Sequence, residues 1–533
     1  MSHIGNQVQQ PAGTRVTGSG MVAATAAPPT RGARRWWAVA AISVSVLVVG
    51  LDLTVLTLAL PTIATDLHAS TSGLQWITDA YILVLAAGVL PAGMLGDRLG
   101  RKKVLTGALT LFGLSSAACA YAATTGELIA ARALLGVGAA AIFPLSLSVI
   151  PVLFEPEDRQ KAITVVASAT MLSLPIGPIL GGYLLNHFWW GSVFLINVPV
   201  VALAITAVSF LLPESKSENR PRIDVLGVLA SGVGLVAFTY GLIKAGEDGW
   251  SDAAVLAATA AGALALAGFV WWERRTAGPL VDLGLFTSGG FRWGTILASL
   301  VSLAMFGLMF ALPQYFQDVR GTDPMGSGAR LLPLIGGMVV GMFAGTRLQA
   351  PRKDRAPALS AKLAVTIGFL IMAAGLAIGA TTSVTSGTGF AAGWFAVAGA
   401  GLGIAMPSSM SAAMSALTAE RSGSGSALLS ALRQAGGVIG VAVLGTVLSN
   451  GYTSDLHLPA AVNAVARQSV AAGVGAATHL RSAQILAHVR TAFVHGMDIM
   501  LTACSGIALI SAVLALAFLP RRADGRAAGR EPR

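Results

Sequence analysis

Three ionisable residues lie deep inside apolar stretches of the sequence, where an ionised side chain is unfavourable. Asp52, Asp79 and Arg132 each interrupt a run of apolar residues, and Arg433 lies near the start of another run. An ionised group at the centre of a membrane span costs about 2.5–3.5 kcal/mol on insertion scales, so it needs a partner or a function. A carboxylate at such a depth can bind a proton or an organic cation, because either one neutralises its charge. The residue types therefore indicate a site at which protons and cations compete.

Their spacing places the first three at similar depths. Asp52 precedes Pro61 by about nine residues, or about 13 Å of helix, while Asp79 lies about 8 Å into the next apolar run. Arg132 lies at a similar depth in the fourth run, so we expect the three side chains to line one polar cavity. The alternative is that Asp79 and Arg132 snorkel to the interface and that Asp52 makes only a structural hydrogen bond. Arg433 lies near the inner end of its run, where snorkelling is favoured.

Aromatic and Met side chains on the same runs are candidates for the walls of such a cavity. Rings and thioethers suit a lipophilic cation, through cation–π attraction and adaptable packing. The candidates are Trp76, Tyr81, Phe306, Met309 and Phe310. Their alternative role is packing, or contact with lipid.

The elements that position these residues are expected to cross a bilayer. Hydrophobic residues make up 54% of the 533, charged residues only 11%, and a soluble protein of this length needs more charge on its surface. The apolar runs are about twenty residues long, which spans a hydrocarbon core. They predict an all-α integral membrane protein with about fourteen helices. The expected helices are 36–60, 74–95, 104–123, 127–154, 161–185, 192–213, 223–244, 252–272, 291–316, 329–348, 359–381, 388–417, 426–449 and 497–519.

The basic residues predict the orientation of these helices. An even number of helices places both termini on one side, and about 27 of the 35 Lys and Arg then fall in the tails and loops of that side. We expect both termini to be cytoplasmic and the protein to lie in a bacterial inner membrane. The net charge of +11 does not indicate a nucleic-acid partner, because the basic residues are spread over short loops.

The runs divide the chain into five parts. We expect a disordered tail (1–35), a six-helix bundle (36–213), a linker with two inserted helices (214–290), a second six-helix bundle (291–519) and a basic tail (520–533). The run that begins at Trp36 is too long for a signal peptide and is expected to remain as an anchor.

One loop and two cysteines offer weaker signals. The outer loop 450–495 has a spacing that suggests one or two surface helices, and its four His match no metal-ligand pattern. We therefore expect solvated histidines and no metal site. Cys119 and Cys504 each lie inside an apolar run and are expected to be small core residues.

Short motifs connect the runs. A loop with alternating acid and base follows the second run and is suited to a charge lock, its residues being Gly93, Asp97, Arg98, Gly100 and Arg101. The fifth run carries Gly177, Pro178, Gly181 and Gly182, which bend a helix and allow close backbone contact. Arg433, Gln434 and Gly436 form a motif in the second half. The stretch Gly341 to Arg347 echoes the loop of the first half without its acid, which indicates an internal repeat.

These motifs resemble a known family of membrane carriers. The loop from Gly93 to Lys103 is similar to the signature between helices 2 and 3 of the major facilitator superfamily. The stretches that contain Asp52, Asp79 and Arg132 resemble the fourteen-helix drug:proton antiporters of the EmrB/QacA type. Thr57, Leu135 and Ser173 depart from that pattern, which has Asn, Gln and Gly at these places.

The resemblance covers about residues 36 to 519 and implies both a fold and roles. It implies the major facilitator fold, in which helices 1–6 and 9–14 form the bundles and helices 7 and 8 are inserted. It implies that Asp52 and Arg132 serve proton coupling, and that Asp79 serves cation recognition or protonation.

Together these observations favour a proton-coupled multidrug antiporter that exports lipophilic, cationic compounds by alternating access. The alternative within transport is export of an endogenous antibiotic, lipid or metabolite. We do not expect an enzyme, because the runs show no nucleophile–base set, and Gly96 to Lys103 does not fit a nucleotide-binding loop. No cofactor is expected beyond the proton gradient, and the protein is expected to be a monomer in contact with lipid.

Overall fold

The computed structural model describes residues 32–216, 224–276, 279–349, 360–418 and 421–520, so both predicted tails lie largely outside the described residues. Fourteen helices in these ranges are long and apolar enough to cross a membrane, which confirms the number expected from the sequence. Length and apolar content explain this agreement, since about twenty apolar residues match the thickness of the hydrocarbon core.

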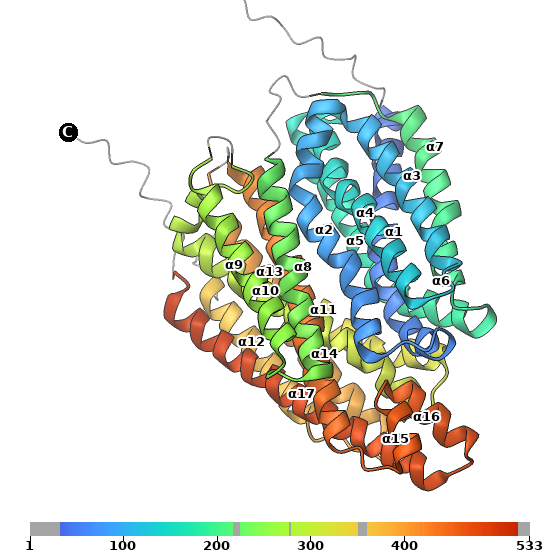
Figure 1. The fold of residues 1–533 in the computed structure, drawn as a ribbon. Coiled ribbons are helices and arrows are strands. Elements are labelled where there is room, and N and C mark those ends of the chain that lie inside the picture. Colours follow the sequence, from blue (N-terminus) through green and yellow to red (C-terminus); the bar gives the residue numbers. More distant parts are fainter. Residues whose placement is uncertain (1–31, 217–223, 277–278, 350–359, 419–420, 521–533) are drawn as a thin grey trace, which may run out of the picture.

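The chain forms two helical halves (Figure 1), and a helical pair comes between them in the sequence. The N-terminal half consists of α1 (Gly32–Asp66), α2 (Thr71–Leu99), α3 (Arg101–Ala120), α4 (Thr125–Leu153), α5 (Pro156–His187), α6 (Ser192–Leu195) and α7 (Asn197–Leu211). The inserted pair is α8 (Val225–Asp248) and α9 (Ala253–Glu273). The C-terminal half consists of η1 (Leu283–Thr287), α10 (Gly289–Gln314), η2 (Tyr315–Val319), α11 (Pro324–Gln349), α12 (Ala361–Gly379), α13 (Thr388–Met414), α14 (Ser422–Ser454), α15 (Ala460–Ala466), α16 (Val470–His479) and α17 (Ala483–Phe518).

The two halves pack against each other in a reciprocal way. The second helix of the N-terminal half, α2, packs on α14, the fifth long helix of the C-terminal half. Conversely α5, the fifth helix of the first half, packs on α11, the second helix of the other. This exchange is typical of an internal two-fold repeat, in which each half uses the same pair of positions to meet its partner. The inserted helix α8 covers one edge of this contact and touches both α2 and α14.

The two ends of the bundle are named here by the elements that lie there. The tail end is the end at which α1 begins and α17 ends, and the α16 end is the opposite one. The short helices α15 and α16 lie at the α16 end, at the lower right of Figure 1. They confirm the surface helices expected within 450–495, although α14 and α17 take up much of that stretch.

Several predicted boundaries are wrong. Helix α1 runs through Pro61 to Asp66, so Asp52 lies about 21 Å from its α16 end rather than about 13 Å. The helix expected at 192–213 is split at Ile196 into α6 and α7, and the helix expected at 497–519 begins at Ala483. In α1 and α17, polar or proline residues lie inside a helix that is sustained by packing on its neighbours, whereas the sequence pattern treats them as breaks. The break at Ile196 is the opposite case, because the apolar run continues through it.

Candidate functional site

An ion pair lies at the centre of the N-terminal half. Nη1 of Arg132 on α4 donates to Oδ2 of Asp52 on α1 at 2.5 Å. Asp52 is 3% exposed and Arg132 is fully buried. The structure therefore brings together the first-helix acid and the fourth-helix base, and neither residue snorkels to the interface. Breaking a buried pair of this kind by removing one partner typically costs about 3–5 kcal/mol.

Close helix packing explains why Arg132 reaches this position. One turn further along α4, a Cβ on Gly136 would lie 2.6 Å from the carbonyl oxygen of Tyr81, so only glycine lets α4 approach α2 this closely. At this separation Nε of Arg132 donates to the carbonyl oxygen of Ile77 at 3.1 Å. The guanidinium group also lies over the ring of Tyr81, 4.3 Å from its centroid. The ion pair is therefore in direct contact with one face of α2.

Two further polar residues complete this centre, and the sequence analysis missed their role. Nδ2 of Asn197, the first residue of α7, lies 3.4 Å from Oδ1 of Asp52 and 3.1 Å from Oγ of Ser116 on α3. Asn197 is an amide residue inside the apolar run 192–213, which is a signal that could have drawn attention to it. Ser116 is one small polar residue in an apolar run and carries no such signal. Side chains from α4 and α7 thus meet the carboxylate of α1, and Ser116 of α3 binds Asn197.

Asp79 does not join this centre, so the expectation of one shared cavity is wrong. Ile77 and Tyr81 face Arg132, and Asp79 lies between them in sequence, about 200° away around the helix from either. One turn before Asp79, Nε2 of Gln75 donates to the carbonyl oxygens of Val441 and Ala442 on α14. The α2 face that carries Asp79 is therefore directed toward the C-terminal half.

Asp79 is unusual in its surroundings. It is fully buried, and neither of its carboxylate oxygens has a hydrogen-bond partner among the described residues. Buried polar atoms are nearly always hydrogen-bonded, and an unpaired one often marks a functional site. The structure thus contains two polar centres on opposite faces of α2, one paired and one unpaired.

The five residues expected to line a cavity fall into two groups. The prediction that Tyr81 and Phe310 line a cavity is wrong in this structure. Tyr81 is 0% exposed and Phe310 is 1% exposed, and both belong to the packed core. Trp76, Phe306 and Met309 are partly buried. Trp76 lies beside Tyr240 of α8, with ring centroids 6.2 Å apart, and Phe306 of α10 packs against Gly437 of α14.

The loop after α2 forms its charge lock inside the N-terminal half. Arg101 binds Oδ1 of Asp97 at 2.8 Å and donates to the carbonyl oxygen of Ser148 on α4. Gly100 has φ +118°, a conformation that favours glycine, and it lets the chain turn sharply between α2 and α3. Gly93 lies beside Pro144 of α4, and Arg98 is exposed. The lock therefore joins α2, α3 and α4.

The fifth-helix motif brings α5 against two different helices. A Cβ on Gly177 or Gly181 would collide with Thr54 or Val55 of α1. A Cβ on Gly182 would lie 2.6 Å from Cα of Met325, the second residue of α11. A Cβ on Gly328, on the next turn of α11, would lie 2.3 Å from the carbonyl oxygen of Pro178. The motif thus lets the two halves approach within backbone distance near the α16 end.

The second-half motif lies on α14. A Cβ on Gly436 would lie 2.5 Å from the carbonyl oxygen of Ser299, so this glycine lets α14 pack closely on α10. Gln434 is buried, and Nε of Arg433 is buried without a hydrogen-bond partner among the described residues.

Hydrogen bonds join the halves at the α16 end. Nε2 of Gln317 on η2 donates to the carbonyl oxygen of Leu58 on α1 at 2.9 Å. Nδ2 of Asn186, after the motif on α5, donates to Asp323 at 2.6 Å. The hydroxyl of Thr71 on α2 donates to the carbonyl oxygen of Gln468, between α15 and α16. The path between the halves is therefore closed on this side.

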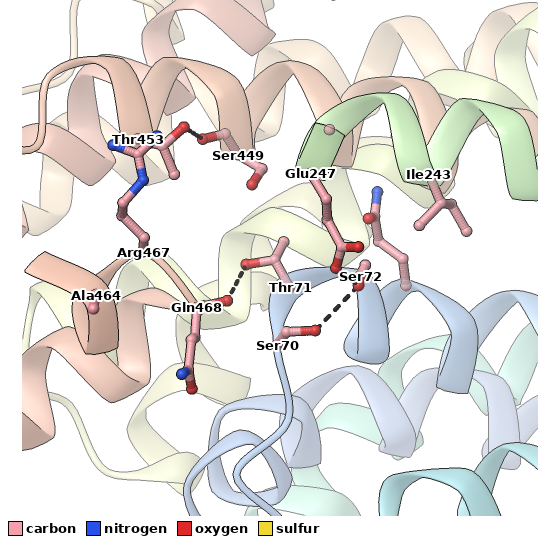
Figure 2. A pocket seen from close by; sticks show the side chains of 12 residues that line it. Ser70, Thr71, Ser72, Ile243, Glu247, Ser449, Thr453, Ala464, Arg467 and Gln468 are labelled. Carbon is pink, nitrogen blue, oxygen red and sulfur yellow. Dashed lines mark hydrogen bonds between the residues drawn. The ribbon is translucent and has the colours of Figure 1, made fainter. Parts of the chain in front are cut away.

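A pocket of about 260 Å³ lies beside these contacts (Figure 2). Residues from α2, α8, α14 and the α15–α16 segment line it, among them Ser72, Glu247, Ser449 and Arg467. The hydroxyl of Ser72 donates to Glu247, which fastens the inserted helix α8 to α2. The pocket is open to the surface beside the hydrogen bond between Thr71 and Gln468.

The described residues contain no group of three His, Cys, Asp or Glu arranged to hold a metal ion. Within the segment 450–495, Nε2 of His488 accepts a hydrogen bond from the backbone N–H of His457. Cys119 and Cys504 are both free and buried, as expected for core residues.

Comparisons with known proteins agree with this architecture. The family model described as Major Facilitator Superfamily matches residues 42–441. The chain is 32% identical to the tetracenomycin C resistance and export protein of Streptomyces glaucescens, over 95% of each chain. It is 34% identical to the multidrug efflux pump LfrA of Mycolicibacterium smegmatis, over 91% of this chain and 95% of that protein. It is 31% identical to the methyl viologen resistance protein SmvA of Salmonella typhimurium, over 90% of this chain and 97% of that protein.

Solved structures show the same fold. A bacterial homologue of the human lysosomal transporter Spinster superposes with a TM-score of 0.67 at 17% identity, covering 92% of this chain and 99% of that one. The fourteen spans, the reciprocal packing of two halves and the matched family model lead to one assignment. The chain is a multi-pass membrane transporter that belongs to the Major Facilitator Superfamily.

Proposed function

We propose that this transporter is a proton-coupled antiporter that exports lipophilic cations from the cytoplasm of a bacterial cell. The observation that carries the proposal is the pair of polar centres on the two faces of α2. One is the closed ion pair of Asp52 and Arg132. The other is the carboxyl of Asp79, which has no partner among the described residues and lies on the α2 face directed toward the other half. The printed names of the relatives, which concern export of or resistance to toxic organic compounds, support the direction of transport.

Each centre suits one of the two transported species. An organic cation needs a negative charge that no protein cation already neutralises, and Asp79 offers one at the contact between the halves. A proton that binds Asp52 neutralises it and weakens its attraction to Arg132. Because Arg132 also binds the carbonyl oxygen of Ile77, movement of this side chain acts on α2 and thus on Asp79. Helix α2 thereby couples the two centres.

The orientation follows from charge. The tail end carries most of the basic loops, which favours a cytoplasmic position for it and for both termini. The structure then corresponds to the state closed toward the outside, in which the contacts at Leu58, Thr71 and Asn186 hold the halves together. Cargo enters from the cytoplasm, and protons from outside drive its release. One charge moved across 100 mV provides about 2.3 kcal/mol, enough for about fiftyfold accumulation.

A second candidate function is export of an endogenous product, with the same proton machinery and a different cargo. It is favoured by the full-length similarity to the tetracenomycin C resistance and export protein. For that cargo, Asp79 would recognise a basic group of the product rather than a permanently charged drug. Accumulation assays with a panel of neutral and cationic compounds distinguish the two functions.

Ethidium transport in inverted membrane vesicles tests the proposal directly. Vesicles that contain the protein are expected to accumulate ethidium when respiration acidifies their interior, and a protonophore is expected to abolish the accumulation. Vesicles without the protein provide the control. Accumulation that persists unchanged with the protonophore would rule out coupling to protons, and no accumulation of any cation tested would rule out cation export.

The close approach at Gly182 leads to a first prediction. In Gly182→Val the new side chain collides with Met325, so we expect the α16 end not to close and ethidium transport to fall at least about tenfold, with normal membrane insertion. Gly336→Val on the facing helix α11 is the matched control, because a Cβ there meets open space. Equal activity of both variants would show that this contact is not needed for closure.

A further inference from the structure

The C-terminal half holds a second group of ionisable residues that the mechanism above does not use. Asp318 lies in η2, a π-helical segment that follows Pro313, while Arg490 and Asp498 lie on α17. All three belong to helices with spans apolar enough to cross a membrane. The expected helix ends at 316 and 497 left Asp318 and Arg490 outside the spans and Asp498 at the edge of one. Single π-helical turns within α-helices are frequent at functional sites.

Each of the three residues has a buried polar atom without a partner. Oδ2 of Asp318, Oδ1 of Asp498 and Nε of Arg490 make no hydrogen bond within the described part of the chain. A lost hydrogen bond at a buried group costs about 1–3 kcal/mol, and more for a charged one. Three such atoms in neighbouring elements are not explained by packing. A carboxyl that carries a proton is less costly to bury than a carboxylate.

The group consists of two neighbouring pairs, Arg490 with Asp318 and Asp498 with Tyr315, which are together called the unit below. Helix α17 packs on η2, and Arg490 lies close enough to Asp318 to act on its charge. Nη2 of Arg490 would lie 3.5 Å from a Cβ on Gly321, two residues after η2. Tyr315, one turn before Asp318, is within electrostatic reach of Asp498. Arg490 and Asp318 therefore lie nearer the α16 end, and Tyr315 and Asp498 lie deeper in the bundle.

Other charged groups near η2 are directed elsewhere. Nη1 of Arg320 donates to the carbonyl oxygen of Val384, and Nη1 of Arg330 on α11 donates to that of Gly326. Tyr452 of α14 is within electrostatic reach of Asp318, and its hydroxyl donates to the carbonyl oxygen of Ala466. The buried residues of α16, which also packs on η2, are apolar: Val470, Ala471, Gly473 and Ala477. Arg490 is thus the cation that faces Asp318.

This unit is in direct contact with the closure between the halves. Gln317, the residue before Asp318, donates to the carbonyl oxygen of Leu58 on α1 at 2.9 Å. When the halves separate at the α16 end, this hydrogen bond breaks and η2 meets water. A change in the charge of Asp318 therefore acts on the segment that holds the end closed.

We propose that Asp318 and Asp498 form a second proton-binding centre, held by the C-terminal half and separate from the Asp52–Arg132 pair. The proton enters from water at the α16 end and binds a carboxylate oxygen, with Arg490 as the positioning counter-charge. Protonation of Asp318 removes its attraction to Arg490 and so alters the packing of η2 on α17. The proposal concerns proton binding alone and does not depend on the identity of the cargo.

Infrared difference spectroscopy of the purified full-length protein in lipid tests this centre without any substrate. Burial favours the protonated form of a carboxyl, so between about pH 5 and pH 8 the wild type is expected to show carboxyl C=O bands whose intensity changes with pH. Asp318→Asn is expected to lose one of these bands, and Asp498→Asn to lose or shift one. Asp66→Asn is the matched control, because Asp66 is exposed at the end of α1, and it should keep every band.

The two carboxyl variants guard against a folding defect, which is checked by the melting temperature and by monodispersity in detergent. If both fold and both retain all the wild-type bands, the centre does not bind protons and the proposal is wrong. Ethidium transport that resists a protonophore would instead contradict the proposed function and leave this spectroscopic result standing, so the two failures are distinguishable.

Discussion

Asp52→Asn is expected to abolish proton-driven ethidium transport and to lower the stability of the protein. The amide cannot take up a proton from the outside, so the step that couples the gradient to α2 is lost. It also leaves Arg132 fully buried without a counter-charge, which is expected to reduce the free energy of unfolding by about 3 kcal/mol. Vesicle transport and thermal unfolding in detergent measure the two effects separately.

Two further variants test the reasons for these effects. Asp66→Asn makes the same chemical change on an exposed residue of the same helix, and it is expected to alter neither transport nor stability. The double variant Asp52→Asn/Arg132→Gln removes both charges, so it is expected to regain stability without regaining transport. If Asp52→Asn still accumulates ethidium at the wild-type rate, this carboxyl does not carry the coupling proton.

Asp79→Asn is expected to raise the ethidium concentration for half-maximal transport at least about tenfold. The substitution removes the one negative charge on the α2 face directed toward α14, and a lipophilic cation loses its counter-ion there. In contrast to Asp52→Asn, it breaks no hydrogen bond with a described residue, because both oxygens of Asp79 are unpartnered. Stability is therefore expected to stay the same or to rise. Transport kinetics over a range of ethidium concentrations measure the first effect.

The charge-conserving variant Asp79→Glu provides the control for Asp79→Asn. It keeps the negative charge and is expected to retain most of the affinity for cations, with a changed preference for cargo size. Neutral compounds, if transported, should be handled equally by both variants. An unchanged concentration dependence for ethidium in Asp79→Asn would show that cation recognition lies elsewhere.

Much of the fold could be predicted from the sequence. The thickness of the bilayer requires each membrane helix to have about twenty apolar residues. Apolar runs of that length can be recognised in the sequence, so the number of spans could be counted. The partnership of Asp52 and Arg132 could also be anticipated, because two buried charges of opposite sign in one membrane need each other. Helix ends were less predictable, as α1 shows by continuing through Pro61.

Part of the site could have been predicted more fully. Asp79 lies two residues from both Ile77 and Tyr81, so helical periodicity already places it on the opposite face of α2 from any group that contacts those two. Depth alone was used instead, and depth does not specify direction. An Asn inside the apolar run 192–213 could be noticed in the sequence, but its contact with Asp52 is known only from the structure.

The sequence by itself determined the class of protein, the number of membrane spans and the charged residues that need an explanation within them. These follow from the length and polarity of local segments, which do not depend on the tertiary contacts that the chain makes. Only the tertiary structure decided which face of each helix meets which neighbour. It directed the Asp79 face of α2 toward α14, brought α5 to α11 at Gly182 and placed Asp318 against α17. Those contacts depend on residues more than a hundred positions apart, and no local pattern encodes them.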